Sequence, residues 1–267
     1  MLTTGANSGI GLATVLELAR LGFDSVGGVR SAAKARTVVE AAAEAGVKAR
    51  TVRLDVTDAA ACARVIDRLR PYGLVNNAGY SATGAVEDVD DGEARRVLET
   101  MVLAPMRLAR LAVPHMRAAG GGRIVNISSI FGRVTTPLTG WYQGSKHAIE
   151  ALSDALRVEV AGDGIKVVLI EPGGFRTGIW QAASTDIEGR EGSRYEAAYQ
   201  RLESGVRATQ RLMGDPETVA RVIGRAMTGR SPRPRQLVGY DAQAIAFWGR
   251  LLPTEVRDRL ARLSLGL

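Results

Sequence analysis

Short apolar runs alternate with longer stretches of helical periodicity, and this alternation limits the fold more than any other feature of the chain. Five runs are short and rich in Val, Ile or Leu: Ser25–Val29, Ala49–Leu54, Gly73–Asn76, Arg123–Ile127 and Lys166–Ile170. Between them lie stretches with apolar residues at helical spacing: Leu12–Leu21, Ala33–Ala45, Ala59–Leu69, Ala94–Met116 and Ser145–Val160. Strands that alternate with helices predict a doubly wound α/β fold, in which helices cover both faces of a parallel sheet.

The chain is long enough for one such domain and shows no point at which it would divide. Single α/β domains reach 267 residues, and a hydrophobic share of 46% is enough to fill a large core. No internal repeat, low-complexity tract or linker interrupts the sequence. We therefore expect a single domain over residues 1–267. Its first strand should be short, because only Met1–Thr4 precede Gly5; the alternative is a natural start further upstream.

Composition and charge exclude several classes of protein. No apolar run approaches the ~18 residues that a membrane-spanning helix needs, and no signal peptide opens the sequence. The single cysteine, Cys62, cannot form an intramolecular disulfide, so a cytoplasmic protein is the expectation. The formal charge of +7 comes mostly from arginines, which are spread over many segments without a basic block. This distribution favours a solvated surface over nucleic-acid binding.

A glycine-rich segment, Thr4–Gly11, stands between the first expected strand and the first expected helix. Glycines let the backbone turn tightly and approach a pyrophosphate, whose charge is then stabilised by the positive end of the helix dipole. A plain strand–helix turn can have the same composition. Alone, the segment indicates a dinucleotide site without establishing one.

Four motifs, in order, resemble those of the short-chain dehydrogenase/reductase family. They correspond to its TGxxxGxG loop, its NNAG segment, its active-site serine with YxxxK, and its PGxxxT segment: Thr4–Gly11, Asn76–Gly79, Ser129 with Tyr142–Lys146, and Pro172–Thr177. The resemblance runs from about Leu2 to Thr177 and more weakly to Val238. It implies a Rossmann-like fold and an oxidoreductase that transfers a hydride between a nicotinamide cofactor and a carbonyl or an alcohol.

The residue types in the active-site motif suit acid–base catalysis. Tyr142 and Lys146 are four apart on a helix and so share one face. An ammonium beside a phenol stabilises the phenolate and lowers its pKa from about 10 toward the working range. Ser129 can hydrogen-bond the substrate oxygen and stabilise charge as the carbonyl is attacked. The resemblance implies that all three are catalytic, and that Lys146 also holds the nicotinamide ribose.

Other side chains nearby compete for these roles. Ser128 is the alternative serine, and the family's spacing to the tyrosine selects Ser129. The two histidines are His115 and His147. Helical geometry turns His147 away from the Tyr142 face, and His115 lies far along a long helix. We expect structural roles for both histidines and no metal site.

The end of the second expected strand indicates the choice of cofactor. An acidic residue there would bind the ribose hydroxyls of NAD, and none is present. Arg30 instead offers a planar cation suited to the 2′-phosphate of NADP, with Ser31 as a second donor; the alternative is an ordinary surface arginine. Asp55 and Val56 resemble the family's adenine-contacting pair. The resemblance implies further cofactor contacts from the four motifs: Gly5, Asn7, Ser8, Gly9, Ile10, Gly11, Asn76, Ala78, Gly79, Tyr142, Lys146, Pro172, Gly173, Phe175 and Thr177.

One position departs from the family's pattern. Many members place an asparagine in the long helix after the fourth strand, where it supports a water linked to the active-site lysine. The segment Glu99–Pro105 aligns with that region and puts Met101 at the asparagine position. Methionine cannot replace the hydrogen bonds of an amide, so we expect an altered proton relay.

The resemblance thins beyond Thr177, because this region shapes the substrate pocket in the family. Residues 178–213 are compatible with helix, and form either a lid over the nicotinamide or a plain surface helix pair. The tail at 241–267 is an apolar, arginine-containing helical segment that packs on its own core or on a neighbouring subunit; a membrane surface is the less favoured alternative. Several related enzymes act on lipophilic alcohols, so an apolar substrate is expected.

The sequence thus predicts an NADP(H)-dependent oxidoreductase that acts on a small lipophilic carbonyl or alcohol, with Tyr142 as acid and base. A homodimer or homotetramer is expected, because Ala94–Met116 and Ser145–Val160 resemble the helices that form subunit contacts in the family. The alternative is an NADP-binding regulatory protein with weak or no catalysis, which would keep the glycine loop and tolerate Met101.

Overall fold

The computed structural model describes residues 1–267, apart from the side chain of Arg250, and the strands form a seven-stranded parallel sheet. Their bounds are β1 (Leu2–Thr4), β2 (Ser25–Val29), β3 (Ala49–Arg53), β4 (Gly73–Asn76), β5 (Gly122–Ile127), β6 (Ile165–Pro172) and β7 (Arg235–Val238). They lie in the order β3-β2-β1-β4-β5-β6-β7. The order reverses between β1 and β4, and at such a switch point the carboxyl ends of the strands open a crevice for ligands.

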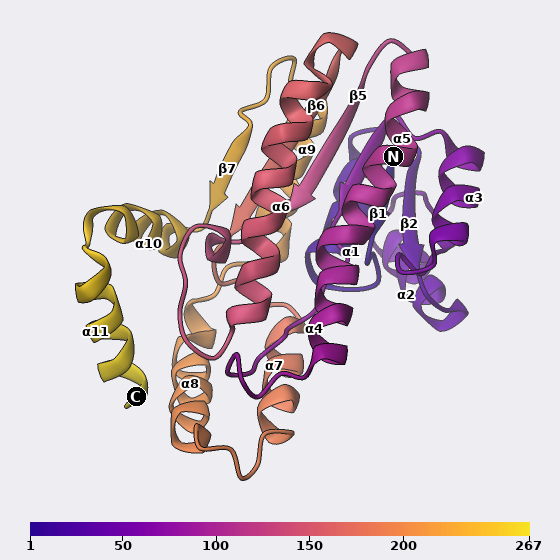
Figure 1. The fold of residues 1–267 in the computed structure, drawn as a ribbon. Coiled ribbons are helices and arrows are strands. Elements are labelled where there is room, and N and C mark those ends of the chain that lie inside the picture. The colour runs from indigo at the N-terminus through magenta and orange to yellow at the C-terminus, as the bar shows by residue number, and fades with distance from the viewer.

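Helices cover both faces of this sheet, as expected for a doubly wound, Rossmann-like fold. One face carries α1 (Gly9–Arg20), α2 (Ala32–Glu44) and α9 (Pro216–Thr228). The other face, turned to the viewer in Figure 1, carries α3 (Ala59–Leu69), α5 (Ala104–Ala118) and α6 (Gly140–Glu159). The sheet and its helices form a single domain.

The central strands are mostly apolar because both faces of the sheet are buried there. Successive residues of a strand point to opposite sides. Leu74 and Ile124 therefore pack under α3 and α5, whereas Val75 and Val125 pack under α1 and α9. All four side chains have 0% exposure. Burial of each stabilises the sheet by about 1.5–3 kcal/mol, which is why these strands show no alternation of polar and apolar residues.

The expected parallel sheet is confirmed, and three elements differ from their expected form. β7 was not expected, because its first two residues, Arg235 and Gln236, are polar. The expected helix Ala94–Met116 consists of α4 (Asp91–Leu98), a π-helical turn η1 (Glu99–Leu103) and α5. α6 begins at Gly140 and so includes Tyr142 in its first turn.

The early start of α6 has a local cause in the loop that precedes it. The Gln143 amide Nε2 donates to the hydroxyls of Thr136 (2.8 Å) and Thr139 (2.6 Å), and its Oε1 accepts from the Thr136 N–H (2.9 Å). Gln143 is almost fully buried. These bonds link the loop to the first turn of the helix, which favours helix formation before Ser145.

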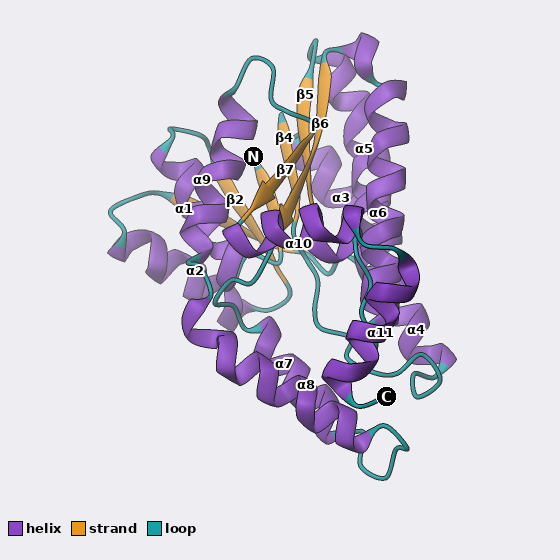
Figure 2. Cartoon of the chain, turned by 90° about the vertical axis from the view of Figure 1, so that its left-hand side faces the viewer, coloured by secondary structure: helices purple, strands orange, loops and turns teal.

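The remaining helices lie beyond the carboxyl ends of the strands, as Figure 2 shows for α7 (Ile179–Glu188), α8 (Glu196–Thr209) and α11 (Thr254–Leu265). The tail packs on the chain's own surface where Leu265 of α11 contacts Tyr199 of α8. Several large apolar side chains of α10 (Tyr240–Leu251) and α11 are nevertheless 41–71% exposed: Ile245, Phe247, Trp248, Leu251, Val256, Leu260 and Leu263. Among the described residues, no helix has both the length and the apolar character to cross a membrane.

Candidate active site

The glycine loop after β1 leaves no room for side chains at its closest approaches. Gly5 and Gly9 have φ values of +63° and +52°, in the left-handed region that glycine adopts without strain. A Cβ at Gly11 would lie 2.2 Å from the carbonyl oxygen of Gly5. Only glycine therefore lets α1 begin so close to the end of β1. The result is an open helix N-terminus beside a tight backbone turn, the arrangement that accepts a pyrophosphate.

The segment after β4 holds this loop in place. The Thr4 hydroxyl oxygen accepts hydrogen bonds from the N–H groups of Asn77 and Ala78, both at 3.0 Å. The Asn77 amide donates to the carbonyl oxygens of Thr4 (3.0 Å) and Gly5 (3.2 Å). The two motifs are thus joined across the switch point of the sheet. Thr4 and Asn77 were not predicted as site residues, because their role depends on the pairing of β1 with β4.

The segment after β6 closes over the loop from the other side. A Cβ at Gly9 would lie 3.1 Å from the methyl group of Thr177, so the two motifs are in contact. Asp241, in the first turn of α10, accepts a hydrogen bond from the Gly174 N–H at 2.5 Å. A Cβ at Gly173 would lie 2.3 Å from a carboxylate oxygen of Asp241. The C-terminal tail therefore fixes the PGxxxT segment, a contact that no local sequence pattern indicated.

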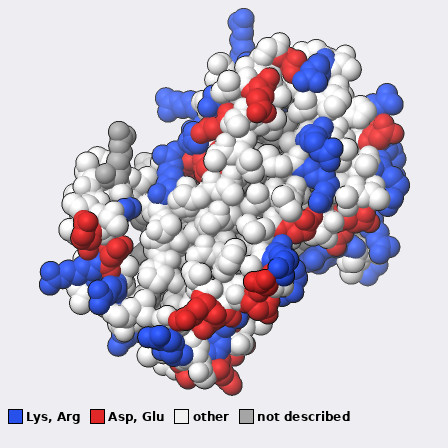
Figure 3. Space-filling model, in the orientation of Figure 1, with Lys and Arg blue, Asp and Glu red and all other residues white. Residues whose placement is uncertain are grey.

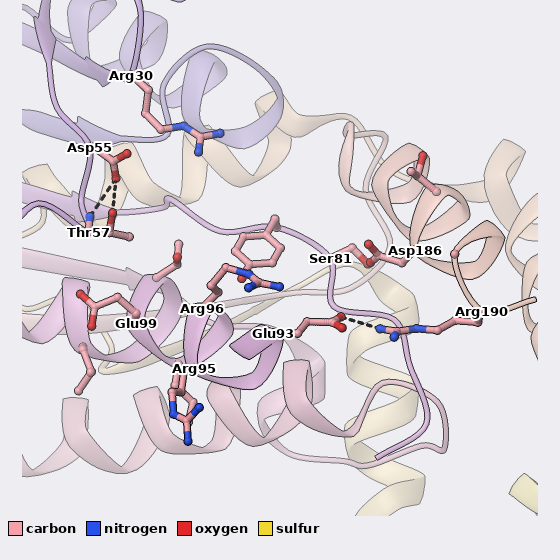
Figure 4. Close-up of a pocket in the computed structure, with 16 residues that line it drawn as sticks. Arg30, Asp55, Thr57, Ser81, Glu93, Arg95, Arg96, Glu99, Asp186 and Arg190 are labelled. Atoms are coloured by element: carbon pink, nitrogen blue, oxygen red, sulfur yellow. Dashed lines mark hydrogen bonds and ion pairs between the residues drawn. The ribbon is translucent and has the colours of Figure 1, made fainter. Parts of the chain in front are cut away.

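A cavity of about 1050 Å³ begins at the carboxyl ends of β2 and β3 and extends to the segment that includes α7 (Figure 4). Arg30 and Asp55 line its first end. Asp55 accepts hydrogen bonds from the Thr57 N–H (3.0 Å) and hydroxyl (2.8 Å), and these bonds, with a smaller effect of the Arg30 charge, lower the pKa of Asp55. Ser31 caps α2 by accepting from the Lys34 N–H. Arg30 and a helix N-terminus thus meet where the adenine ribose of a dinucleotide would lie.

The other end of the cavity is closed by polar contacts between two distant segments. They join α7, α8 and the turn between them to the loop after β4 and to α4: Asp186 with the Thr83 N–H (3.0 Å), Arg190 with Glu93 (2.6 Å) and Tyr199 with Asp88 (2.7 Å). Asp186, Arg190 and Glu93 line the cavity, and Figure 4 shows the Arg190–Glu93 ion pair across it. Residues of α7 and of the turn after it are therefore attached to the rim of the cavity by charge and hydrogen bonding, while α8 adds apolar packing through Ala198 and Tyr199.

Ser129, Tyr142 and Lys146 come together at the carboxyl edge of the sheet. The Lys146 Nζ lies 5.5 Å from the centroid of the Tyr142 ring and donates to the carbonyl oxygen of Ile127 at 2.9 Å. Phe131 meets Tyr142 edge to face, with ring centroids 6.4 Å apart. Ser129 and Lys146 are largely buried, at 7% and 8% exposure. None of the three lines the 1050 Å³ cavity.

Burial dominates the electrostatics of these groups. It raises the pKa of the Tyr142 phenol to about 12, although hydrogen bonding with Ser129 acts in the opposite direction. Burial also lowers the pKa of Lys146 to about 8, against the effect of the nearby Glu150 charge. The expected lowering of the tyrosine pKa by Lys146 is not present in this structure. Loss of hydration outweighs the hydrogen bond with Ser129.

Met101 lies in an apolar site beside Tyr142. It is 2% exposed and packs with Ala82, Val97 and Tyr142. A Cβ at Gly79 would lie 3.3 Å from its sulfur atom, so the methionine fills the space against the NNAG segment. Met101 also belongs to the π-helical turn η1, a kind of irregularity that often marks functional sites.

Two of the proposed cofactor residues point into the protein. The Asn76 amide donates to Asn126 (2.8 Å) and to the carbonyl oxygen of Pro105 (3.2 Å), deep beneath the site. Phe175 is 4% exposed and packs in the core on the α9 side of the sheet. Their side chains hold the motifs in place. His147 also acts locally, since its ring Nδ1 pairs with the carbonyl oxygen of Gln143 on its own helix.

Comparison with known proteins identifies the family. The family model described as short chain dehydrogenase matches residues 1–188. The chain is 35% identical to the uncharacterized oxidoreductase YusZ of Bacillus subtilis, over 83% of this chain and 82% of that protein. It is 30% identical to mouse retinol dehydrogenase 5 (96% and 85%) and 29% identical to an NADPH-dependent 3-dehydrocapnine reductase of Ornithobacterium rhinotracheale (97% and 94%).

Solved structures agree with this assignment. A short-chain dehydrogenase from Streptomyces avermitilis superposes with a TM-score of 0.78 at 31% identity, covering 98% of this chain and 94% of that one. A family member from Burkholderia phymatum, in complex with NAD, gives a TM-score of 0.80 at 26% identity (94% and 91%). The chain belongs to the short-chain dehydrogenase/reductase family, whose members are oxidoreductases that use nicotinamide cofactors.

Proposed function

We propose that this protein is an NADP(H)-dependent oxidoreductase that interconverts a carbonyl and an alcohol on a small lipophilic molecule. The observation that carries the proposal is the convergence of Ser129, Tyr142 and Lys146 at the sheet edge that also bears the glycine loop. Carbonyl reduction requires a site for the nicotinamide that donates the hydride and an acid–base group that donates the proton, both on one edge.

The chain's own residues would bind the substrate oxygen and move its proton. The nicotinamide, when bound, supplies or accepts the hydride. The Ser129 hydroxyl donates a hydrogen bond to the substrate oxygen, and the Tyr142 phenol gives its proton to that oxygen in reduction and takes it back in oxidation. Because burial raises the pKa of Tyr142 to about 12, the phenol holds its proton at neutral pH, which favours reduction. The Lys146 ammonium stabilises the phenolate that remains and holds the cofactor ribose.

The preference for NADP rests on Arg30. Its guanidinium lines the cavity beside Asp55 and precedes the N-terminus of α2, and no carboxylate ends β2. A planar cation and a helix N-terminus both favour a phosphate over two ribose hydroxyls. One relative is an NADPH-dependent enzyme and one solved structure is a complex with NAD, so the comparisons favour neither cofactor. The proposal of NADP therefore rests on the residues of this chain.

The lipophilic substrate is supported by one relative. The cavity is lined mostly by charged and polar side chains, with Tyr80, Leu98 and Leu103 as its apolar members, and it does not include Ser129, Tyr142 or Lys146. The similarity to a retinol dehydrogenase points to the same class of substrate. We assign residues 178–213 the role of a lid, because Asp186 and Arg190 of this segment close one end of the cavity through polar contacts.

A homodimer or homotetramer is proposed through the outer faces of α5 and α6. Large apolar side chains are exposed there or in the adjoining π-helical turn: Leu103 (54%), Leu152 (41%) and Val158 (67%). Figure 3 shows a broad surface over α6 that has few charged side chains between its charged margins. An exposed surface with little charge is typical of a subunit contact. We place the protein in the cytoplasm, acting on a small molecule and without a nucleic-acid partner.

The Tyr142→Phe variant tests the proposed reaction. Turnover of NADPH with a panel of carbonyls should fall about 10²–10⁴-fold, the usual contribution of a positioned acid–base group. Cofactor affinity, measured by fluorescence titration, should change little. Tyr72→Phe, at a half-exposed tyrosine outside the site, is the matched control. Substantial turnover in Tyr142→Phe would mean that another group transfers the proton.

Met101 favours a second candidate, an NADP-binding regulator, because it removes the amide of the usual relay. Such a protein would bind NADPH and turn over none of the carbonyls or alcohols in the panel. Binding without turnover in the unmodified protein would therefore support the regulator and reject the enzyme.

A further inference from the structure

Two buried carboxyl groups lie behind the catalytic lysine and have no part in the reaction described above. Glu150 follows Lys146 by one turn of α6 and is 6% exposed. Glu171, near the end of β6, is 0% exposed. The Nε of Arg235 lies within 4 Å of a carboxylate oxygen of each, so the two carboxyl groups are close neighbours. Buried carboxylates in contact are costly, so this pair requires a physical explanation.

Arginines from two other segments face the pair. Arg235 of β7 approaches Glu150 (Nε to Oε2, 2.9 Å) and Glu171 (Nε to Oε1, 3.6 Å). Arg133, in the loop before α6, donates from Nε to Glu171 Oε1 at 2.9 Å. The guanidinium of Arg235 also pairs with Asp154, one turn further along α6. Arg157 binds the other side of Asp154 at 3.1 Å. The charged groups around the pair thus include both signs.

The arginines leave two oxygens of the pair without a hydrogen bond. Glu150 Oε1 and Glu171 Oε2 are buried and have no hydrogen-bond partner among the described residues, although the Arg133 guanidinium lies 2.8 Å from Glu171 Oε2 as an ion pair. A proton held between Glu150 and Glu171 would give these oxygens a hydrogen bond and remove one of two adjacent negative charges. Burial raises the pKa of Glu171 to about 7, and the neighbouring Glu150 adds to the rise. A shared proton at neutral pH is consistent with both observations.

Lys146 is the cation on the catalytic side of this pair. Residues 146 and 150 share one face of α6, and the charge of Glu150 raises the pKa of Lys146 against burial. A Cβ at position 132 would lie 2.7 Å from the Ser128 hydroxyl and 3.0 Å from Glu150 Cγ, so Gly132 allows these groups to approach. The Ser128 hydroxyl is itself buried and without a partner. Polar groups therefore continue from the pair toward the lysine.

We propose that Glu150 and Glu171 share one proton, and that the negative charge of this pair stabilises the ammonium form of Lys146. The pair acts as a positioning group: it does not touch the substrate, and its effect passes through the lysine. Where Met101 replaces the relay amide, the pair is the source of charge that keeps Lys146 protonated. The catalytic consequence rests on the proposed function, whereas the state of the lysine can be measured without it.

The chain offers a direct measurement because it has only four lysines: Lys34, Lys48, Lys146 and Lys166. In cofactor-free protein carrying ¹³C-labelled lysine, the Cε signal of Lys146, assigned with Lys146→Arg, is followed against pH. Its midpoint should lie at about 8. In Glu150→Gln the midpoint should fall by about one unit or more, because an opposite charge nearby is lost. In Glu150→Asp, which keeps the charge, most of the shift should be recovered.

Asp154→Asn provides the matched control. Asp154 binds the same arginine and lies on the same helix, but two turns from Lys146, so the midpoint should not move. A midpoint that is unchanged in Glu150→Gln, or that moves equally in Asp154→Asn, would overturn the proposal.

The unmodified protein supplies a test that does not depend on the folding of any variant. Its infrared spectrum near neutral pH should contain a band from a protonated carboxyl group in a dry environment, and Glu171→Gln should lack it. Absence of the band in the unmodified protein would reject the shared proton.

The pH profile of turnover then connects the pair to catalysis. The alkaline limb of the pH profile of kcat should move to lower pH in Glu150→Gln. In Glu150→Asp it should lie close to its position in the unmodified protein. If Tyr142→Phe retains turnover, the proposed reaction fails while the lysine midpoints still stand. If the midpoints do not move while Tyr142→Phe is inactive, the pair alone is rejected.

Discussion

The sheet with its covering helices is held together differently from the helical segments at 178–213 and 240–265; α9 and β7, which lie between those segments in the chain, belong to the sheet region. The sheet buries apolar side chains on both faces, and its site loops are fixed by backbone contacts such as those of Thr4 and Asn77. The later helices reach the cavity through ion pairs and hydrogen bonds, and α10 and α11 leave apolar side chains exposed. The sheet region therefore allows few substitutions, whereas the partly exposed polar contacts of α7 and of the turn after it can be exchanged at lower cost.

This difference separates two functions. The family model matches residues 1–188, which include the sheet through β6 and all the motifs. Substitutions within residues 1–188 should change cofactor affinity and the rate of hydride transfer for every substrate. Changes after Thr177 should affect one substrate more than another. Substitutions in each region can therefore test whether cofactor binding and substrate choice depend on different parts of the chain.

The largest effect is expected at the cofactor end of the sheet. In Arg30→Asp, a carboxylate would repel the 2′-phosphate and accept hydrogen bonds from ribose hydroxyls. The ratio of NADPH to NADH affinity should fall roughly 100-fold, about 2.7 kcal/mol. Titration of both cofactors measures it. Arg20→Asp, at the far end of α1, is the control and should leave the ratio unchanged. Equal affinities in the unmodified protein would contradict the assignment, and so would a shift confined to one substrate.

A smaller effect is expected in the packed site beside Tyr142. Met101→Asn places an amide among Ala82, Val97 and Tyr142, and an unpaired buried amide costs ~1–3 kcal/mol. The free energy of unfolding, from urea titration, should fall by that amount. Met101→Leu conserves the apolar volume and should cost less than about 1.5 kcal/mol. An asparagine variant that is as stable as the parent and faster in turnover would show that a polar relay can be restored here.

The smallest effect is expected at the lid. Arg190→Met removes the ion pair with Glu93 and the bond to the carbonyl oxygen of Asp88. The pair is partly exposed, so its loss should weaken lid closure by about 1 kcal/mol. The KM of a bulky carbonyl should rise roughly fivefold, with NADPH affinity unchanged. Arg211→Met, at an exposed position of the same segment, is the control. An equal loss of affinity for all substrates and for NADPH would contradict the idea that the lid affects substrate choice alone.

The sheet could be predicted from the sequence because its determinants are local. A strand buried on both faces is a continuous apolar run, as in Gly73–Asn76, and each helix between strands has its own period. β7 was missed because Arg235 forms ion pairs with Glu150 and Glu171, which lie 85 and 64 positions earlier in the chain. A polar strand that is stabilised by distant charges has no local pattern.

The convergence of Ser129, Tyr142 and Lys146 was predicted from spacing, and the electrostatics of these groups were not. The position of Lys146 near Tyr142 followed from a separation of four on a helix. The rise of the Tyr142 pKa depends on how much water the surrounding segments exclude, including Phe131 and Met101, and no motif encodes this quantity. For the same reason Glu171 gave no signal, since its partners come from three separate elements.

The hydrogen bonds between Thr4 and the segment after β4 also constrain the order of folding. The hydroxyl of Thr4 meets its partners 73 and 74 positions further along the chain. Contacts between such distant residues form late, because the entropy of closing a long loop must be overcome first. A growing chain that ends at α3 contains the whole glycine motif but not the strand that fixes it. We therefore expect the proposed dinucleotide site to become complete only after β4 has joined β1, so that a bound cofactor would stabilise the assembled sheet instead of nucleating it.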